Sequence, residues 1–285
     1  MKQMMKHVLG LTAAALVCVS CSKEPAVDLR PEQSLFGRLA LDSEVSLGVE
    51  SRAELDLKTV IPGLTVPTKS QFTLELKGDN IEELEDKGGS LEVVSRFNYS
   101  ERWPFADYPK PDLYPGLYTA TVTYGNPEAI GRNLPYYKGS ATAEVKIGQV
   151  TECKITAKIA NAAVRIQLEA NFKKYFSDPE FYLVVNDAQQ TAYKLTGATG
   201  EAPVFVPAGA KVSFTGTVRR PSQTSDNDKE GELLEVTIPV REMAAGTLHT
   251  YRLTAEAGSG SVDVVFEDAQ VGSDEEIEVN DGQKS

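Results

Sequence analysis

The sequence predicts an all-β protein built from two tandem β-sandwiches. From Cys153 to Glu169 apolar and polar residues alternate, which is the pattern of half-buried strands. This run is longer than one ordinary strand, and four small residues, 160–163, interrupt it. We therefore interpret it as the end of one β-domain and the start of the next. Short alternating runs separated by turn signals fill the remainder, and almost no helix is evident, which favours sandwiches.

Residues 1–20 form a short leader with an apolar run at 8–19. The run is shorter than the about 20 residues that a membrane-spanning helix needs, so it predicts a secretory signal peptide. Ser20 and Cys21 at its end resemble a bacterial lipobox, although Cys18 stands where a leucine is usual. We expect cleavage before Cys21 and lipidation of its sulfur, which anchors the mature protein to a membrane.

Residues 21–34 are mostly polar, contain two prolines and are expected to form a flexible tether behind the lipidated cysteine. Residues 35–159 are expected to form the N-terminal β-sandwich. Its expected strands are the alternating runs at 35–41, 44–50, 72–76, 118–124, 139–148 and 153–159, while 61–67, which holds two prolines, is expected to be a loop or an edge.

Residues 160–285 repeat this plan loosely and are expected to form the C-terminal β-sandwich. One helical turn is expected at 171–176, with Asn171 as its cap. The expected strands are the alternating runs at 164–168, 181–185, 212–218, 235–240, 251–255 and 262–266.

Several motifs carry a resemblance to a known family. YPGLYTATV is followed by PYYKGSATAEVKIGQVTECKITAKIANAAVRI, and then by FKKYF and FYLVVND. In this order they resemble an uncharacterised family of Bacteroidales surface lipoproteins built on a domain of unknown function. That family is similar in layout to fimbrillin-type pilus and anchor lipoproteins. The resemblance implies two Greek-key sandwiches, transthyretin-like or immunoglobulin-like, on a protein lipid-anchored at the outer membrane or cell surface, and it supplies no catalytic residues.

Charge and cysteine content narrow the function classes. The formal net charge of −12 repels phosphate backbones, so we expect no nucleic-acid partner. Cys18 lies in the leader and Cys21 is used for the lipid, which leaves Cys153 without a disulfide partner. Because Cys153 lies on the apolar face of its strand, we expect a buried thiol rather than a nucleophile.

Catalytic and metal-binding patterns are sparse. His249 is the only histidine outside the leader, and its place after Gly246 and Thr247 predicts an exposed turn residue. The acidic stretch 226–232 resembles the start of a calcium loop, but Thr237 stands where the twelfth-position glutamate is needed. We interpret the stretch as an acidic hairpin tip, and we expect no metal, no cofactor and no enzymatic activity.

Aromatic residues are densest at 96–114. Trp103, Phe105 and Tyr108 lie there, and Tyr136 and Tyr137 are expected nearby. Flat rings beside hydrogen-bonding groups could stack on sugars, so these five residues are the candidate ligand-binding set. The alternative, which we favour, is that Trp103 and Phe105 fill the end of the first core.

The sequence thus predicts a non-enzymatic surface lipoprotein that acts in cell adhesion or as a component of a pilus-like assembly. Its expected partners are the membrane, through the lipid, and other surface or pilus proteins or glycans. The alternative function is a glycan-binding surface lipoprotein that uses the aromatic platform. A removable first strand or an unpaired sheet edge would favour assembly, whereas an accessible aromatic platform would favour glycans.

Overall fold

The computed structural model describes residues 35–45, 61, 63–196, 202–220, 231–255 and 262–270, and the predicted all-β class is confirmed. In this part of the chain the regular structure consists of strands β1 to β14, two short 3-10 helices and one short α-helix. No helix among these residues has the length and apolar character needed to cross a membrane. The signal peptide, Cys21 and the tether predicted at 1–34 lie outside the described residues.

The first half contains one six-stranded sheet in the order β1-β6-β5-β4-β2-β3. β1 runs parallel to β6, and the other neighbours are antiparallel. β5 and β6 pair only at Tyr137–Ile159 and Lys138–Lys158, so the sheet folds over between them. The strands are β1 (Arg38–Val45), β2 (Thr73–Asp86), β3 (Leu91–Pro104), β4 (Gly116–Tyr124), β5 (Tyr137–Val145) and β6 (Val150–Ile159).

Folding of the sheet encloses the first core. Leu39 on β1 and Ile155 on β6 lie in one buried cluster with Leu74 on β2 and Val122 on β4. A side chain at Gly139 of β5 would collide with the carbonyl of Thr156, so the close approach of β5 and β6 requires glycine there. The alternation seen in the sequence therefore faces one shared interior, as expected for a sandwich.

The second half is a sandwich of two four-stranded sheets, β10-β7-β13-β14 and β12-β11-β8-β9. β7 and β13 pair in parallel, whereas the other neighbours are antiparallel. The strands are β7 (Ala162–Leu168), β8 (Ser177–Val185), β9 (Ala188–Thr196), β10 (Val204–Val206), β11 (Lys211–Arg220), β12 (Glu232–Glu242), β13 (Thr247–Ala255) and β14 (Val262–Gln270).

The predicted helical turn is present as α2 (Ala170–Tyr175), but its N-cap is Glu169 rather than Asn171. The side chain of Asn171 instead donates to the carbonyl oxygen of Ala255, at 3.0 Å. Phe172 and Phe176 of this segment are buried in the second core, which holds the short helix against the sandwich.

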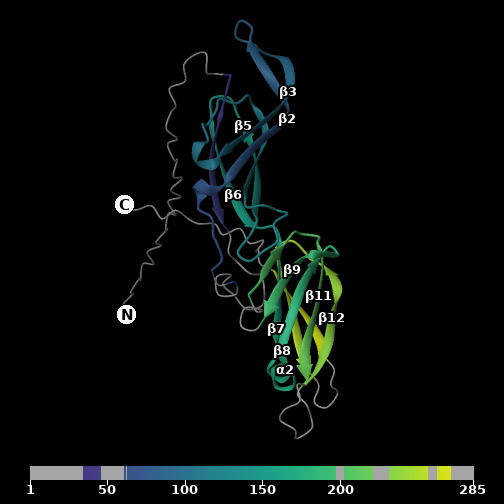
Figure 1. Ribbon diagram of the computed structural model, residues 1–285. Helices are drawn as coiled ribbons and strands as arrows, with labels where there is room; N and C mark the ends of the chain where they lie inside the picture. Colours follow the sequence, from purple (N-terminus) through teal and green to yellow (C-terminus); the bar gives the residue numbers. More distant parts are fainter. Residues whose placement is uncertain are drawn as a thin grey trace, which may run out of the picture.

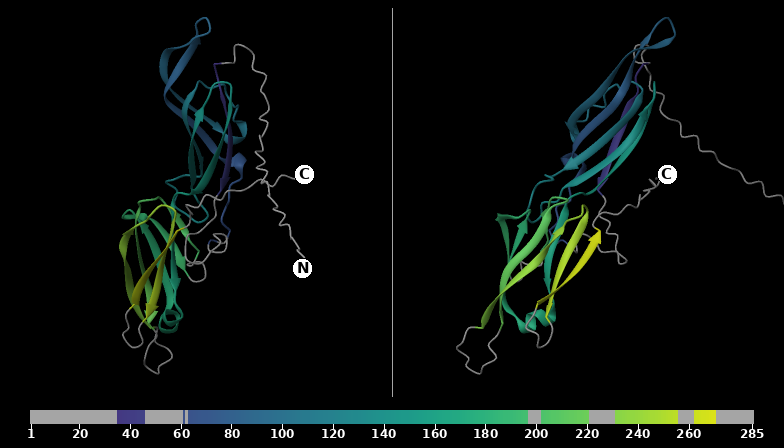
Figure 2. Two further views of the ribbon diagram at one scale, coloured as in Figure 1. Left: turned by 180° about the vertical axis from the view of Figure 1, so that it is seen from behind. Right: turned by 90° about the vertical axis from the view of Figure 1, so that its right-hand side faces the viewer.

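The two halves lie end to end (Figures 1 and 2), with the β2–β3 hairpin at the far end of the first half and α2 at the far end of the second. β6 ends at Ile159 and β7 begins at Ala162, so the small residues lie where the chain passes from one half to the other. The division into independent domains at residue 160 remains a prediction.

The junction between the halves is buried. Ala163, Phe205 and Leu248 come from the second half, yet they belong to the hydrophobic cluster of the first half. The loop between β4 and β5 reaches the second half, where Gly131 and Phe205 exchange backbone hydrogen bonds of 3.0 and 2.8 Å. Shared apolar packing and a backbone bridge thus join the two halves at this point.

Asn161 connects three segments at the junction and is only 1% exposed. Its Oδ1 accepts from the backbone N–H of Tyr136 at 3.0 Å, and its Nδ2 donates to the carbonyl of Leu134 at 3.1 Å. Its own carbonyl accepts from the N–H of Gly246 at 3.0 Å. The buried side chain thus pairs with backbone groups of Leu134 and Tyr136 at the junction.

Candidate functional site

The predicted aromatic segment closes one end of the first core. Phe105 is 6% exposed, and its N–H donates to the carbonyl of Phe72 at 2.8 Å, which turns the chain inward after β3. Trp103, the next-to-last residue of β3, is half-buried and packs edge-to-face on Tyr108 with ring centroids 5.5 Å apart. These contacts agree with the interpretation of Trp103 and Phe105 as core-filling residues.

Tyr108 places a polar group in this apolar region. Its hydroxyl is buried and has no hydrogen-bond partner in the described part of the chain. Burial, together with the nearby Tyr99 and Cys153, raises the pKa of Tyr108 well above that of a free tyrosine. The Cys153 thiol is buried as predicted, and burial raises its pKa, which disfavours the nucleophilic thiolate.

Tyr136 and Tyr137 precede and begin β5. Tyr137 is fully buried, its hydroxyl donates to the carbonyl of Thr65 at 3.3 Å, and its ring lies 6.3 Å from that of Tyr124. Tyr136 is half-buried at the junction. Of the five predicted ligand-binding residues, Phe105 and Tyr137 are therefore inside the core, and Trp103, Tyr108 and Tyr136 keep part of their surface exposed. A ligand for these three remains a prediction.

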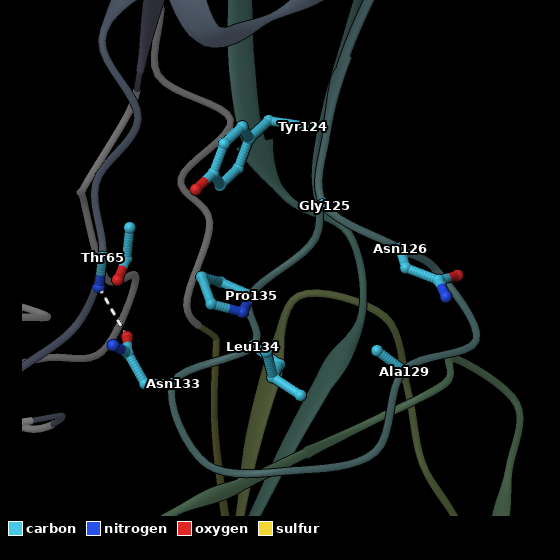
Figure 3. A pocket seen from close by; sticks show the side chains of 8 residues that line it. All are labelled: Thr65, Tyr124, Gly125, Asn126, Ala129, Asn133, Leu134 and Pro135. Atoms are coloured by element: carbon cyan, nitrogen blue, oxygen red, sulfur yellow. Dashed lines mark hydrogen bonds between the residues drawn. The ribbon is translucent and has the colours of Figure 1, made fainter.

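A small pocket lies between the β4–β5 loop and the segment at Thr65 (Figure 3), and sequence reasoning did not identify it. Its volume is about 130 Å³. Two of its amide oxygens already accept backbone hydrogen bonds, Asn133 from Thr65 at 2.7 Å and Asn126 from Glu128 at 3.0 Å. The lining residues are Thr65, Tyr124, Gly125, Asn126, Ala129, Asn133, Leu134 and Pro135.

This lining contains no carboxylate, histidine, cysteine or basic side chain. The pocket can therefore hold a few water molecules or a small neutral group, and its lining has no carboxylate, imidazole or amine to activate the hydroxyls of Thr65 and Tyr124. No sequence motif marked it, because its walls come from turn residues whose proximity depends on how the loop folds back over Thr65.

His249 is the clearest error of the sequence-based predictions, since it is not an exposed turn residue. It lies on β13 and is 2% exposed. Its Nδ1 lies 2.9 Å from Oδ1 of Asp268, and its Nε2 accepts from the N–H of Ala244 at 3.0 Å. The alternation of His249 with the apolar residues Tyr251 and Leu253 was the signal that could have placed it inside.

Asp268 connects this histidine to Arg241 of β12, whose Nη2 lies 2.9 Å from Oδ2. Burial opposes ionisation of Asp268, but hydrogen bonds from Arg241 and His249 outweigh it and lower the pKa of Asp268. A carboxylate that orients a histidine also occurs in catalytic triads. Here both ring nitrogens are already engaged and the ring is shielded from solvent, and the cluster joins β12, β13 and β14.

No group of three or more histidine, cysteine, aspartate or glutamate side chains suited to a metal ion occurs among the residues that the structure describes. The acidic stretch at 226–232, interpreted from the sequence as a hairpin tip, lies mostly outside them.

Comparison with known proteins identifies the family. No curated protein sequence matches the chain. The chain is similar in structure to a fimbrial assembly protein from Parabacteroides distasonis, with 10% identity and a TM-score of 0.38 over 70% of this chain and 88% of the other. It is also similar to a fimbrial protein from Bacteroides vulgatus, with 10% identity and a TM-score of 0.32 over 82% and 99% of the two chains. The sequence model of DUF4493, a domain of unknown function, matches residues 68–281. Because that match spans most of the sequence, the chain belongs to the DUF4493 family, as the resemblance in the sequence predicted.

Proposed function

We propose that the protein is a non-enzymatic surface lipoprotein that acts in cell adhesion or as a component of a pilus-like assembly. The observation that supports this best is the elongated body with a buried junction (Figure 1). A protein that projects from a cell and bears load through its partners benefits from a stiff connection between its halves. Packing of Phe205 and Leu248 into the first core supplies such a connection.

Unpaired sheet edges add a means of association. Among the described strands, β3 ends the first sheet and pairs with β2 alone, and β12 and β14 each end one sheet of the second half, with β1, β9 and β10 at the opposite ends of the three sheets. An edge strand presents unpaired backbone N–H and C=O groups to which another strand can add. Together with the lipid expected on Cys21, these edges suit a protein held at the outer membrane or cell surface that binds other proteins there.

Glycan binding is the second candidate. Half-buried rings at Trp103 and Tyr108 favour it, since an edge-to-face pair leaves part of each ring accessible. Burial of Phe105 and Tyr137 reduces the platform that the sequence suggested. Adhesion or assembly through protein surfaces therefore explains more of the geometry than sugar recognition does.

A deletion strain tests the proposal. Cells that lack the protein should adhere less to surfaces or partner cells, or carry fewer surface filaments in electron micrographs, and wild-type protein should restore this. A Cys21→Ala variant is the matched control, since it should be made but not retained on the cell. Unchanged adhesion and filaments would contradict the proposal. Loss of binding to purified glycans as the sole defect would favour the second candidate.

A further inference from the structure

The free edges differ in how they are protected against pairing with another strand. Natural sheets protect edges with proline, bulges and inward-pointing charges. β12 carries Pro239, and its register with β11 shifts between Val212 and Phe214. β3 has two register shifts against β2 and ends at Pro104. Both edges are therefore poorly suited to accept a regular strand.

β14 has neither a proline nor a register shift, and its inward-pointing charge, Asp268, lies near one end, where His249 and Arg241 pair with it. It pairs with β13 over its full 9 residues, Val262 to Gln270, without a register shift, and it contains neither proline nor lysine. No strand of the described part of the chain pairs with its other side. In the right-hand view of Figure 2 it is the yellow strand at the outer edge of the second half.

The hydrogen-bonding pattern of β13 shows which residues of β14 face the open edge. The carbonyl of Leu253 accepts from Glu169 at 3.0 Å, so it points away from β14. Backbone groups alternate along a strand, and the residues on either side of Leu253 therefore bond to their β14 partners, Asp263 and Val265. By the same alternation, Val264 and Phe266 present their N–H and C=O groups at the open edge.

Apolar side chains accompany this edge. Val265 is 53% and Phe266 is 40% exposed, and Val264 is partly buried against the second core. At one end Arg241 crosses from β12 and lies over the ring of Phe266, 4.6 Å from its centroid. An added strand would cover the remaining apolar surface while it completed the ladder.

Charge on the outward face defines the strand that fits. Asp263, Val265 and Glu267 lie on that face, because they alternate with the inward Val264 and Phe266. Asp263 has no ion-pair partner among the described residues. Glu267 lies 3.3 Å from Arg252, which also binds Glu169 at 2.7 Å. Arg252 thus pairs with two carboxylates, Glu267 and Glu169, while Asp263 on the same face is unpaired among the described residues, so the outward face at β14 has an excess of negative charge.

We propose that the β14 edge is a docking site for an extended polypeptide segment that is apolar on one face and carries basic residues opposite Asp263 and Glu267. The segment adds antiparallel to β14, with a backbone ladder at Val264 and Phe266 and an apolar residue opposite Val265. This inference rests on the proposed role in adhesion or assembly and names the chemistry of the partner at one edge of the protein.

Synthetic peptides as long as β14, 9 residues, test the proposal on the full mature protein. One peptide carries lysines at the positions opposite Asp263 and Glu267 and apolar residues elsewhere, and its pair carries glutamates instead. Calorimetric titration should show that the protein binds the lysine peptide and that its affinity for the glutamate peptide is lower by about tenfold or more. The reason is that opposite charges across strands attract and like charges repel. Hydrogen exchange should slow at residues 262–270.

Methylated peptides distinguish strand addition from non-specific electrostatic binding of a positively charged peptide. N-methylation of the residue opposite Val264 removes an edge hydrogen bond and should abolish binding, whereas methylation opposite Val265 alters an N–H that points away and should leave binding intact. Equal effects of the two methyl groups, no binding of the lysine peptide, or slowed exchange at β3 or β12 instead would each overturn the proposal.

Two further results would separate this inference from the proposed function. The mature protein could instead associate with itself, with slowed hydrogen exchange at residues 262–270 and no peptide bound. This result would identify a second copy of the protein as the occupant of the β14 edge and would refute the proposal of a basic partner segment. Cells whose adhesion or filaments depend on the protein, combined with no peptide binding, would leave the function supported and refute the β14 site alone.

Discussion

Replacement of Asn161 by alanine should weaken the whole protein, because this side chain holds the junction between the halves. The substitution removes the acceptor of the Tyr136 N–H and the donor to the Leu134 carbonyl, at 3.0 and 3.1 Å. Asn161 is 1% exposed, so water does not readily replace either bond. A buried backbone group left without a partner costs about 1–3 kcal/mol, and two such groups give an expected loss of about 2–6 kcal/mol in the free energy of unfolding.

Asn126→Ala is the matched control. Its Oδ1 also accepts a backbone N–H, from Glu128 at 3.0 Å, but it lies in an exposed loop where water can take over. We expect a loss below about 1 kcal/mol for this variant. Urea unfolding should be followed by the fluorescence of Trp103, the single tryptophan, and by circular dichroism, which monitors the strands of both halves.

The two probes also test whether the halves unfold together. Residues of the second half contribute to the first core, so both signals should change at one urea concentration in the wild-type protein. Equal stability of the Asn161 and Asn126 variants would refute the assigned role of Asn161. Well-separated transitions in the wild-type protein would refute the coupling of the halves.

Three other changes have defined outcomes. Trp103→Ala should lower the free energy of unfolding by about 2–3 kcal/mol, because removal of the half-buried ring leaves a cavity beside Tyr108. The urea concentration at the unfolding midpoint would measure this loss. A variant that is as stable as the wild-type protein but loses glycan binding would support the alternative function. Asp268→Asn should destabilise the protein at pH 7, and the difference in stability from the wild-type protein should shrink as the pH falls below about 4. A carboxyl group whose pKa is lowered in the folded state stabilises the protein above its unfolded pKa and loses this effect when it is protonated. A stability difference that does not depend on pH would contradict the Arg241–Asp268 interaction. Cys21→Ala should leave the leader uncut or release the protein from membranes, which fractionation with labelled palmitate detects, and wild-type behaviour would refute the lipid anchor.

The alternation in the sequence located most strands, because side-chain period depends only on neighbouring residues. The strand at 118–124 shows this best, since Tyr118, Ala120 and Val122 are all buried. Strand pairing was beyond that reasoning. The parallel pairs β1–β6 and β7–β13 join residues far apart in the sequence, and no local pattern specifies such partners.

The candidate site was predicted less well, for a related reason. Thr247, Leu248, His249 and Thr250 form a run of four buried residues, although only every second one faces the second core. Leu248 belongs instead to the core of the first half. Contact with the first half thus buries Leu248 on the outer face of β13, whereas His249 lies on the face that it shares with Tyr251 and Leu253 of the second core.

Packing within the first half explains why the five predicted aromatic residues do not form one platform. Phe105 and Tyr137 belong to the first core, so their rings are not available at the surface. Tyr137 is buried and donates to Thr65, and the N–H of Tyr136 is held by Asn161. Trp103 and Tyr108 keep partly exposed rings. Of the five predicted aromatic residues, only Trp103, Tyr108 and Tyr136 therefore keep surface that a ligand could contact, whereas the β14 edge offers a longer and more regular surface for a partner.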